Sequence, residues 1–595
     1  MSEAPPTALG PQELRRLEAE AIASVSGAQL MAYTRGVARW VRLSGEMDER
    51  RAFEYVEGVL RELGVRTRLI EHDAFISLPG RARLEIVAPR REELPCITHA
   101  FAAPTGPQGI EGELVDVGAG TAEAYARAAG KIALLEGLGI GGRVRRGEEH
   151  GAIAQIFIHG EYAHETSVSP LWGAPTPETA HLLPKTPSFS VNRAVGTRLR
   201  ELLRGGAVRL RLWGEVTTGW RTIPLLVGDL PGELEPDRFV LLSSHLDAWH
   251  YGAMDNGSAN ATLLEALRVL AGRMRRRGLR VAFWSGHSHG RFAGSAWYAD
   301  HFWFDLYQHC VAHVNADSTG GRGATVLEEA PVMAELRALA AEFIRTIGGQ
   351  ELRGRRIGRF ADQSFVGVGV PSIFGTFSEQ DAADPESRRG LSFLSHGGGR
   401  AAGLGWWWHT PEDTVDKVDE AFLVRDTRIY VGVIFRLVNE PILPLDYRAT
   451  AREFREQLTH YQEAARGALD LGAEIAAAAA LEARTEQLAA LLADETVAAD
   501  PRRRRAVNDT LLRLGRLLVP VGYTIEGPFG QDLGVALPAI PGLARAEALG
   551  AMDPASSEAR MLYTGLRRQA NRVRFALEEA VRAIEAVLAG GSHDG

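Results

Sequence analysis

Residues 245–256 read HLDAWHYGAMDN and follow directly on the apolar run FVLLSS at 239–244. A short apolar run bounded by polar residues predicts a buried strand. His245 and Asp247 therefore stand at the end of a predicted strand, and Asp255 follows in a glycine-containing loop. Imidazole and carboxylate groups therefore gather at the end of one predicted strand and in the loop that follows it. The neighbouring segments indicate the fold around them.

The neighbouring segments predict the fold class. Ser258 is expected to N-cap a helix with a leucine face. Further strands are predicted at 280–285, 310–316 and 371–377. Alternating strands and helices with short loops are typical of an α/β fold, in which a mostly parallel sheet carries helices on both faces.

Several polar residues lie where such a sheet binds its ligands, beyond the carboxyl ends of the strands. His245, His287, His289 and Asp317 all come just past predicted strands. We therefore expect these four side chains to share one edge of the sheet.

The chain has 595 residues, a length that predicts two to four domains. Residues 1–94 combine helical patterns with strand-like alternation and are assigned to the first part of the core. Residues 95–232 are rich in Gly, Pro and short β-like runs and predict an inserted β-rich domain that can cover a site. The α/β core then occupies 233–445, and long Ala, Leu, Glu and Arg segments predict a helical domain at 446–595.

The composition is that of an ordinary soluble globular protein. Hydrophobic residues make up 45% and charged residues 24% of the chain, and the net charge is -8. No strong basic bias exists, so nucleic acid is not an expected partner. The arginine runs at 275–277 and 502–505 are predicted to be solvated faces rather than a nucleic-acid patch.

Cysteine content and hydropathy bear on location. Cys96 and Cys310 are the only cysteines, which argues against a disulfide framework and suits a reducing cytosol. Cys310 is expected to be a buried strand residue rather than a nucleophile. Residues 1–12 are polar and lack the pattern of a signal peptide, and no run of about 18 apolar residues predicts a membrane span. A cytoplasmic protein without a membrane partner is expected.

Five residues form a candidate metal site: His245, Asp247, Asp255, Asp317 and His409. Imidazole and carboxylate together suit zinc or a similar divalent ion. Asp247 is expected to fix the tautomer of His245, as supporting acids do in metal sites. A single loop Asp or His more often only caps or turns the chain, but five at strand ends and loops favour a metal site.

The same residues resemble the co-catalytic zinc exopeptidases, the aminopeptidase and glutamate carboxypeptidase family. That family shows His-x-Asp, a later loop Asp, Glu-Glu, Asn-x-Asp and a late His. The resemblance implies that Asp255 bridges two metal ions, that His245 and Asp317 complete the shell of one, and that His409 belongs to the other.

Other features point to one branch of the family. The surroundings of Trp249 resemble glutamate carboxypeptidase and the transferrin receptor, and Asp362-Gln363-Ser364-Phe365 resembles the element before a family strand. This branch implies a protease-associated domain, which matches the texture of 95–232. It also implies a helical dimerisation domain, which matches 446–595, and hence a homodimer.

The chain departs from the family where the Glu-Glu pair should stand. Counting forward from Trp284 places the pair on His287-Ser288, and counting back from Gly294-Ser295 places it on Ser288-His289. His287, Ser288 and His289 are therefore the candidate catalytic residues, together with Asp247, and His289 is also a candidate metal ligand. A histidine can bind zinc or act as a base, whereas Ser288 cannot replace a glutamate base.

A few further residues are weighed as site components. Arg291 is expected either to clamp an anionic group or to make a surface salt bridge. Trp406-Trp407-Trp408 either wall a pocket or pack in the core, with Trp408 nearest to His409. His159, Tyr162 and His164 in the inserted segment can reach over the site, but such loop residues are more often solvated.

These patterns favour a metal-dependent hydrolase of an amide or peptide-like bond, with one or two zinc ions and a small amide or short peptide as substrate. Because the acid pair is altered, two alternatives stay open. One is a non-catalytic binding or scaffold protein on the same fold. The other is a single-metal lyase or cyclase.

Overall fold

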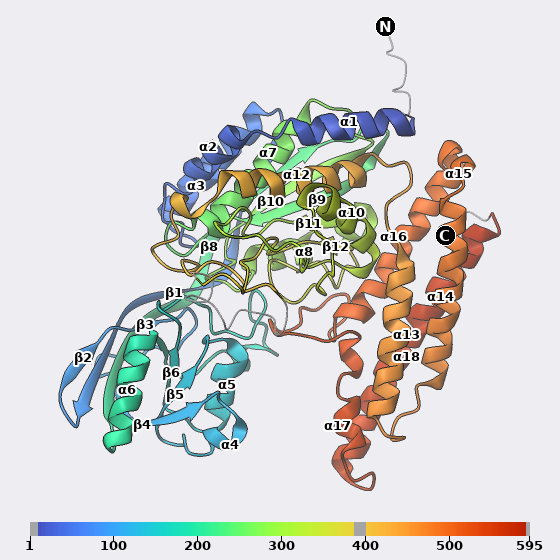
Figure 1. Ribbon diagram of the computed structural model, residues 1–595. Helices are drawn as coiled ribbons and strands as arrows, with labels where there is room; N and C mark the ends of the chain where they lie inside the picture. The colour runs from blue at the N-terminus through green and yellow to red at the C-terminus, as the bar shows by residue number, and fades with distance from the viewer. Residues whose placement is uncertain (1–9, 386–399, 591–595) are drawn as a thin grey trace.

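The computed structural model describes residues 10–385 and 400–590 (Figure 1). The core sheet lies in the upper body, a lower lobe is connected to it by two long strands, and a group of long helices lies at the right (Figure 1). The residues on which the absence of a signal peptide was predicted lie almost wholly outside the described ranges. Among the described residues, no helix is long and apolar enough to cross a membrane.

The strands of the upper body are β1 (Arg66–Ala88), β8 (Arg209–Leu230), β9 (Glu235–His245), β10 (Arg277–Trp284), β11 (Cys310–Asn315) and β12 (Ser372–Ile373). Its helices are α1 (Pro11–Ala23), α2 (Gly27–Val37), α3 (Met47–Glu62), α7 (Ala259–Ala271), α8 (Ala293–His301), α9 (Trp303–His309), α10 (Arg337–Gly348) and α12 (Glu420–Asn439).

The centre of the sheet is parallel, as predicted. Strands β12, β11, β9 and β10 are neighbours in that order and pair in parallel, and β8 joins β10 antiparallel. The strand predicted at 371–377 is shorter than expected, because only Ser372 and Ile373 pair with β11. The α/β fold class with a mostly parallel core is confirmed.

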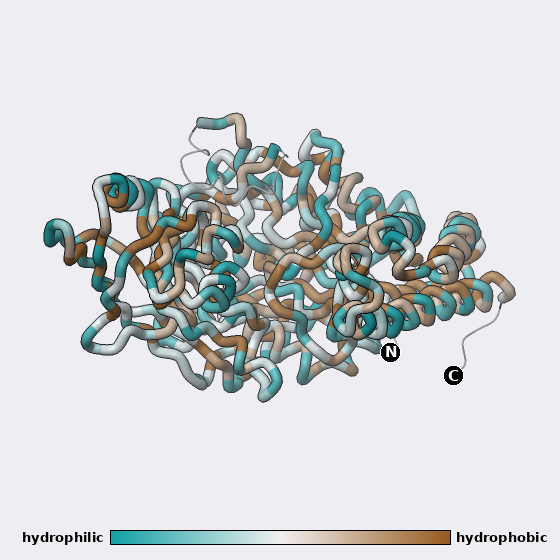
Figure 2. The backbone as a smooth tube through the Cα atoms, turned by 90° about the horizontal axis from the view of Figure 1, so that it is seen from below, coloured by the Kyte–Doolittle hydropathy of each residue, from teal (hydrophilic) through white to brown (hydrophobic). Residues whose placement is uncertain are grey.

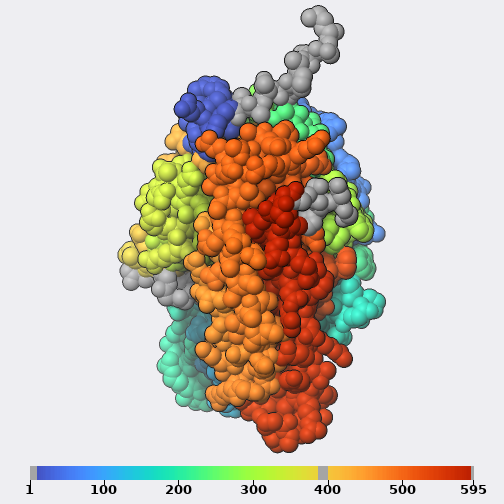
Figure 3. All heavy atoms as spheres, turned by 90° about the vertical axis from the view of Figure 1, so that its right-hand side faces the viewer, coloured from blue at the N-terminus to red at the C-terminus, as the bar shows by residue number. Residues whose placement is uncertain are grey.

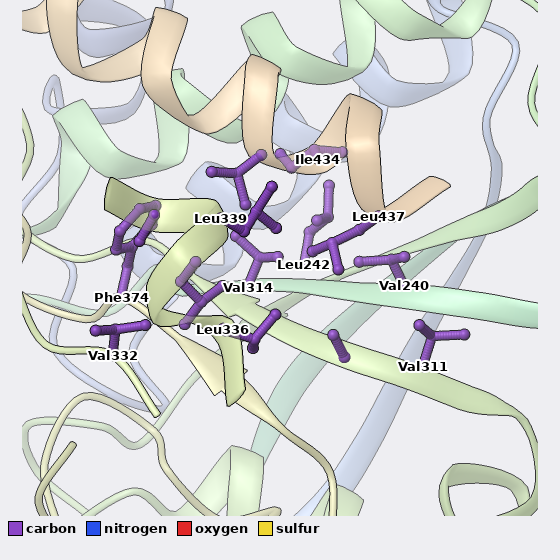
Figure 4. Close-up of a cluster of buried hydrophobic side chains, with 14 of the residues drawn as sticks. Val240, Leu242, Val311, Val314, Val332, Leu336, Leu339, Phe374, Ile434 and Leu437 are labelled. Carbon is purple, nitrogen blue, oxygen red and sulfur yellow. The ribbon is translucent and has the colours of Figure 1, made fainter. Parts of the chain in front are cut away.

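Helices cover both faces of this sheet because its central strands are apolar on both sides. Val240 and Leu242 of β9 point into one cluster, where they meet Ile434 and Leu437 of α12 (Figure 4). Leu241, between them in sequence, faces the opposite cluster. Truncation of such fully buried leucines costs about 2–5 kcal/mol, so this packing holds the strand ends in place.

The lower lobe is built on the two longest strands. β1 and β8 pair antiparallel over almost their whole length and run from the upper body into the lobe (Figure 1). The lobe adds β2 (Glu92–Leu94), β3 (Ile97–Thr98), β4 (Ile110–Gly118), β5 (Ile132–Glu136), β6 (Ala154–Ile158) and β7 (Ser188–Val191), with α4 (Ala122–Tyr125), α5 (Gly141–Glu149) and α6 (Arg193–Gly205). Strands β4 to β7 pair in parallel, and helices α4, α5 and α6 lie between or after them in sequence. The segment is therefore a mixed α/β lobe rather than the β-rich domain that was expected.

The C-terminal part is helical, as predicted, and forms one long side of the molecule (Figure 3). It comprises α13 (Tyr447–Ala464), α14 (Gly472–Leu492), α15 (Glu495–Ala499), α16 (Pro501–Tyr523), α17 (Ala546–Gly550) and α18 (Ser557–Leu588). Hydrophilic and hydrophobic residues alternate along these helices (Figure 2). Apolar residues at helical spacing form a stripe along one face of each helix, and the helices pack side by side through these stripes.

Two local predictions need correction. Ser258 is the N-cap residue of α7, as predicted, but its side chain makes no capping hydrogen bond: its hydroxyl lies 2.9 Å from the carbonyl oxygen of Met254 and 2.6 Å from that of Thr319. The run 275–277 is not a solvated face, since all three arginines are buried. Arg277 Nε donates to Glu235 Oε2 at 2.8 Å, so the ion pair and several carbonyls compensate its burial.

Candidate functional site

The predicted edge of the sheet is confirmed. β9 ends at His245, which pairs with Trp284 at the end of β10. β11 ends at Asn315, two residues before Asp317. Because these strands are parallel, the loops that follow them open on the same side of the sheet.

Asp255 lies opposite His245 in the turn Ala253–Ser258. His245 Nδ1 donates to the carbonyl of Asp247 at 2.8 Å, so the neutral ring carries its lone pair on Nε2. That Nε2 atom faces Asp255 Oδ1 at 3.2 Å and Asp317 Oδ1 at 3.9 Å. Lone pairs directed at one another in a buried space require a cation or a proton between them.

His409 has the same arrangement on the other side of Asp255. Its Nδ1 donates to the carbonyl of Glu165 at 2.6 Å, and its Nε2 lies 2.9 Å from Asp255 Oδ2. The two oxygens of Asp255 thus point at two different imidazoles, which is the placement needed for a carboxylate shared between two ions. The ring of Trp408 stacks on His409 with 3.4 Å between centroids.

His287 joins this group and brings with it an acid that the sequence had not identified as functional. Its ring stacks on His245 with 3.7 Å between centroids, and its Nδ1 lies 2.7 Å from Asp362 Oδ2. Asp362 Oδ1 in turn accepts the Ser295 hydroxyl at 2.6 Å. The only sequence signal for Asp362 was its place in a loop before a strand, within the stretch that resembles a family element.

His289 points elsewhere. It is completely buried, with Nδ1 3.0 Å from Ser44 Oγ, and its ring lies against Trp249 with 4.2 Å between centroids. Ser288 is placed by its backbone, whose N–H donates to Asp247 Oδ2 at 2.9 Å. Of the three residues at 287–289, the geometry therefore brings His287 beside His245 and directs His289 toward the interior.

The carboxylate of Asp247 does not hold His245 in the way expected. It lies 3.7 Å from His245 Nδ1, whose hydrogen bond goes to the backbone carbonyl of Asp247 instead. The carboxylate accepts from the backbone N–H groups of His287 and Ser288 and from the Ser44 hydroxyl. Asp247 thus fixes the loop that carries His287, since a buried carboxylate needs such donors.

Two further residues that the sequence left without a role hold the loop that begins at His245. Arg42 is fully buried and donates to the carbonyls of Leu246 at 2.7 Å and Gly252 at 2.9 Å. Asp413 accepts from the N–H groups of Met254 at 2.8 Å and Asp255 at 3.0 Å. Burial raises the pKa of Asp413 to about 7.

The electrostatics of the site favour a cation. Burial opposes protonation of His245, yet the hydrogen bond and charge of Asp255 and the charges of Asp317 and Asp247 outweigh it and raise its pKa to about 10. Ligand atoms of His245, His287 and Asp317 all lie within 4.8 Å of one another. Oxygen and imidazole donors of this kind, each held by a second hydrogen bond, fit a divalent ion such as zinc.

The remaining sequence candidates fall into three groups. Within the described residues Arg291 makes no salt bridge: it donates to the carbonyl of Gly534 at 3.0 Å, and burial lowers its pKa to about 10. Trp407 is core, whereas Trp406 and Trp408 are partly buried. Cys310 is a buried strand residue, as expected, and burial raises its thiol pKa to about 12.

The two candidate histidines of the inserted segment, His159 and His164, are not solvated. His159 and His164 are both fully buried. His164 Nδ1 donates to the carbonyl of Trp408 at 2.6 Å, and Tyr162 stacks on Trp406 with 4.6 Å between centroids. The inserted segment therefore contacts the chain directly beside His409.

Known proteins resemble the chain in both sequence and fold. The family model described as Peptidase family M28 matches residues 226–433. The probable glutamate carboxypeptidase VP8 of Zea mays is 26% identical over 521 residues, which cover 73% of this chain and 70% of that protein. Aminopeptidase NAALADL1 of Mus musculus is 28% identical over 400 residues, 61% of this chain and about half of that protein, 52%.

Solved structures share the fold. BSAP, a zinc aminopeptidase from Bacillus subtilis, superposes with a TM-score of 0.53 at 19% identity, covering 70% of this chain and 96% of that one. A peptidase M28 precursor from Shewanella amazonensis gives a TM-score of 0.56 at 18% identity, covering 73% and 97%. At these identities the likeness concerns the fold.

Proposed function

Because the α/β core of this chain belongs to peptidase family M28, we propose that the protein is a zinc-dependent hydrolase of an amide or peptide-like bond with a histidine in place of the family's acid pair. The substrate is a small amide or a short peptide. The observation that carries the proposal is the pair His287 and Asp362, set beside His245.

His245, Asp255 and Asp317 would hold one ion, and Asp255 and His409 would contribute to a second. When bound, the ion supplies a Lewis acid that polarises the scissile carbonyl. Only two of these residues face the second position, so we expect one ion to bind more tightly than the other. Each imidazole is already turned for this role, because its Nδ1–H is engaged and its Nε2 faces a carboxylate.

His287 takes the proton-handling role. Its Nδ1–H donates to Asp362, so Nε2 is the atom that accepts a proton from the attacking water. Asp362 stabilises the imidazolium that forms, and the proton then passes from Nε2 to the leaving amine. Asp362 itself is oriented by the hydroxyl of Ser295, which donates to its Oδ1.

The direct test is hydrolysis of an amide and short-peptide library by the zinc-loaded protein and by His287→Gln. We expect the variant to retain the zinc held by His245, Asp255 and Asp317 and to lose about 100-fold or more in kcat. His301→Gln, an exposed histidine on α8, is the matched control. A wild-type protein that stays metal-free in excess zinc would instead favour the scaffold alternative.

The domain organisation and the assembly are proposed on separate grounds. We infer that the segment 95–232 acts as a protease-associated-like domain, which its contacts beside His409 support. The C-terminal helices are the expected dimer surface. Helix α18 exposes Met561 and Phe575 at 64% and 62%, two apolar side chains on one side of the helix that a second copy can cover.

A further inference from the structure

A line of buried polar side chains crosses the lower lobe from β3 toward the candidate site. His99 Nε2 lies 2.6 Å from Ser190 Oγ, and Ser190 Oγ lies 2.9 Å from His159 Nε2. His159 Nδ1 accepts from the backbone N–H of His164 at 2.9 Å. All four residues are at most 2% exposed. We call His99, Ser190, His159 and His164 the histidine chain.

The histidine chain ends on the segment that carries His409. His164 Nδ1 donates to the carbonyl of Trp408 at 2.6 Å. Glu165, the next residue, donates its N–H to the carbonyl of His409 at 3.0 Å and accepts from His409 Nδ1 at 2.6 Å. Three hydrogen bonds thus join residues 164–165 to residues 408–409.

The partners settle the direction of each hydrogen bond. The Trp408 carbonyl can only accept, so His164 carries its proton on Nδ1. The backbone N–H of His164 can only donate, so His159 accepts at Nδ1 and donates from Nε2 to Ser190. Ser190 then donates to His99 Nε2. Burial lowers the pKa of both His99 and His164 to about 4, so both rings are neutral at pH 7.

His409 itself needs support from its surroundings. Its backbone φ is +55°, a left-handed conformation that is uncommon for a residue other than glycine. Such a conformation persists when neighbouring contacts impose it. The contacts that do so come from residues 164–165, and they also fix which nitrogen of His409 faces Asp255.

We propose that the histidine chain is a positioning device, by which the inserted segment holds the ring of His409 with Nε2 directed at Asp255. The proposal rests on the proposed function, because it assigns a purpose to His409 as a zinc ligand. Outer partners of metal-binding histidines alter metal affinity by about 10- to 100-fold when they are removed. His164 and Ser190 are therefore positioning residues, although neither touches the site that they support.

The first test compares His164→Leu with His164→Asn. Leucine removes the donor to the Trp408 carbonyl, whereas asparagine keeps an N–H close to the place of Nδ1. We expect His164→Leu to weaken zinc binding at the second, weaker position by about 10-fold or more, measured by competition with a chelator. Asparagine should restore most of that affinity. KM should change less than kcat in His164→Leu, because substrate contacts are untouched.

The second test breaks the chain further from the site. Ser190→Ala removes the hydroxyl between His159 and His99, and Ser188→Ala is its matched control, since Ser188 is a buried serine two residues away on β7. Both variants should lower the melting temperature. Only Ser190→Ala should also weaken zinc binding at the second position.

Three results would overturn the positioning role. One is unchanged zinc affinity in His164→Leu; another is equal loss of affinity in Ser190→Ala and Ser188→Ala; the third is failure of His164→Asn to recover any affinity. If His164→Leu does not fold, the Ser190 and Ser188 pair decides. A wild-type protein that binds no zinc rejects the proposed function as well, whereas wild-type binding with unaffected variants rejects only the positioning role.

Discussion

Asp362 Oδ2 lies 2.7 Å from Nδ1 of His287, across 75 positions of sequence, and the His287 ring stacks on His245. A carboxylate in this position stabilises an imidazolium and selects the tautomer with a free Nε2. The pair therefore supplies a histidine and an acid beside His245, although the segment 287–289 contains no glutamate.

Asp362→Asn should lower kcat by about 100- to 10,000-fold while leaving the fold intact. The amide can present a donor to Nδ1, which favours the wrong tautomer of His287. Steady-state kinetics across pH would measure the loss, and Asp553→Asn, on an exposed turn, is the control. Activity equal to wild type would remove Asp362 from the proton-handling role.

Metal removal should destabilise the protein. The buried carboxylates of Asp255 and Asp317 share the single imidazole of His245, so a divalent ion compensates their charge further than a proton on His245 can. Zinc at 100 times its Kd adds about 2.7 kcal/mol to the free energy of unfolding. Calorimetry with and without chelator measures this gain, and we expect His245→Ala to abolish it. An identical melting curve in both conditions contradicts the site.

Acid should destabilise the fold through histidines that are buried neutral. Burial lowers the pKa of His313 to about 3 and of His99 to about 4, while an unfolded histidine titrates near 6.5. Between those values the unfolded chain binds protons that the folded chain does not. Stability therefore rises with pH in this window and is lost as pH falls from about 6.5 to 4. Denaturant unfolding of wild type and His313→Gln, in which the acid sensitivity should be smaller, measures the effect.

Arg42→Met should destabilise the loop that begins at His245. The guanidinium of Arg42 is buried and satisfies the carbonyls of Leu246 and Gly252, which would otherwise lack these donors. A hydrogen bond from a charged donor contributes about 1.5–3 kcal/mol, so the loss should exceed about 2 kcal/mol in free energy of unfolding. Arg35→Met, which changes an exposed arginine on α2, is the control. Zinc affinity should fall as well, since the same loop carries Asp255.

The proposed dimer can be tested on α18. Phe575→Glu places a charge in the proposed apolar interface and should convert the dimer to a monomer in sedimentation at micromolar concentration. Phe304→Glu changes a phenylalanine on α9 that is at least as exposed and should leave the dimer intact. A wild-type protein that sediments as a monomer at that concentration counts against the proposal.

Local pattern determined the strands, the edge of the sheet and the residue types at that edge. Apolar runs at 239–244, 280–285 and 310–316 became neighbouring parallel strands, so His245 and Asp317 were bound to meet. Hydrophobic burial depends mainly on composition and period, which a sequence displays directly. The helical C-terminal region followed from the same signal.

Only the tertiary structure decided how each ring is turned. Asp362 reaches His287 from 75 residues away, and the carbonyl of Glu165 reaches His409 from 244 residues away. The sequence likewise left open which of His287 and His289 faces the site, and packing directs His289 toward Ser44 and Trp249 instead. A hydrogen bond depends on distances of a few tenths of an ångström between distant segments, and local periodicity carries no information about those distances.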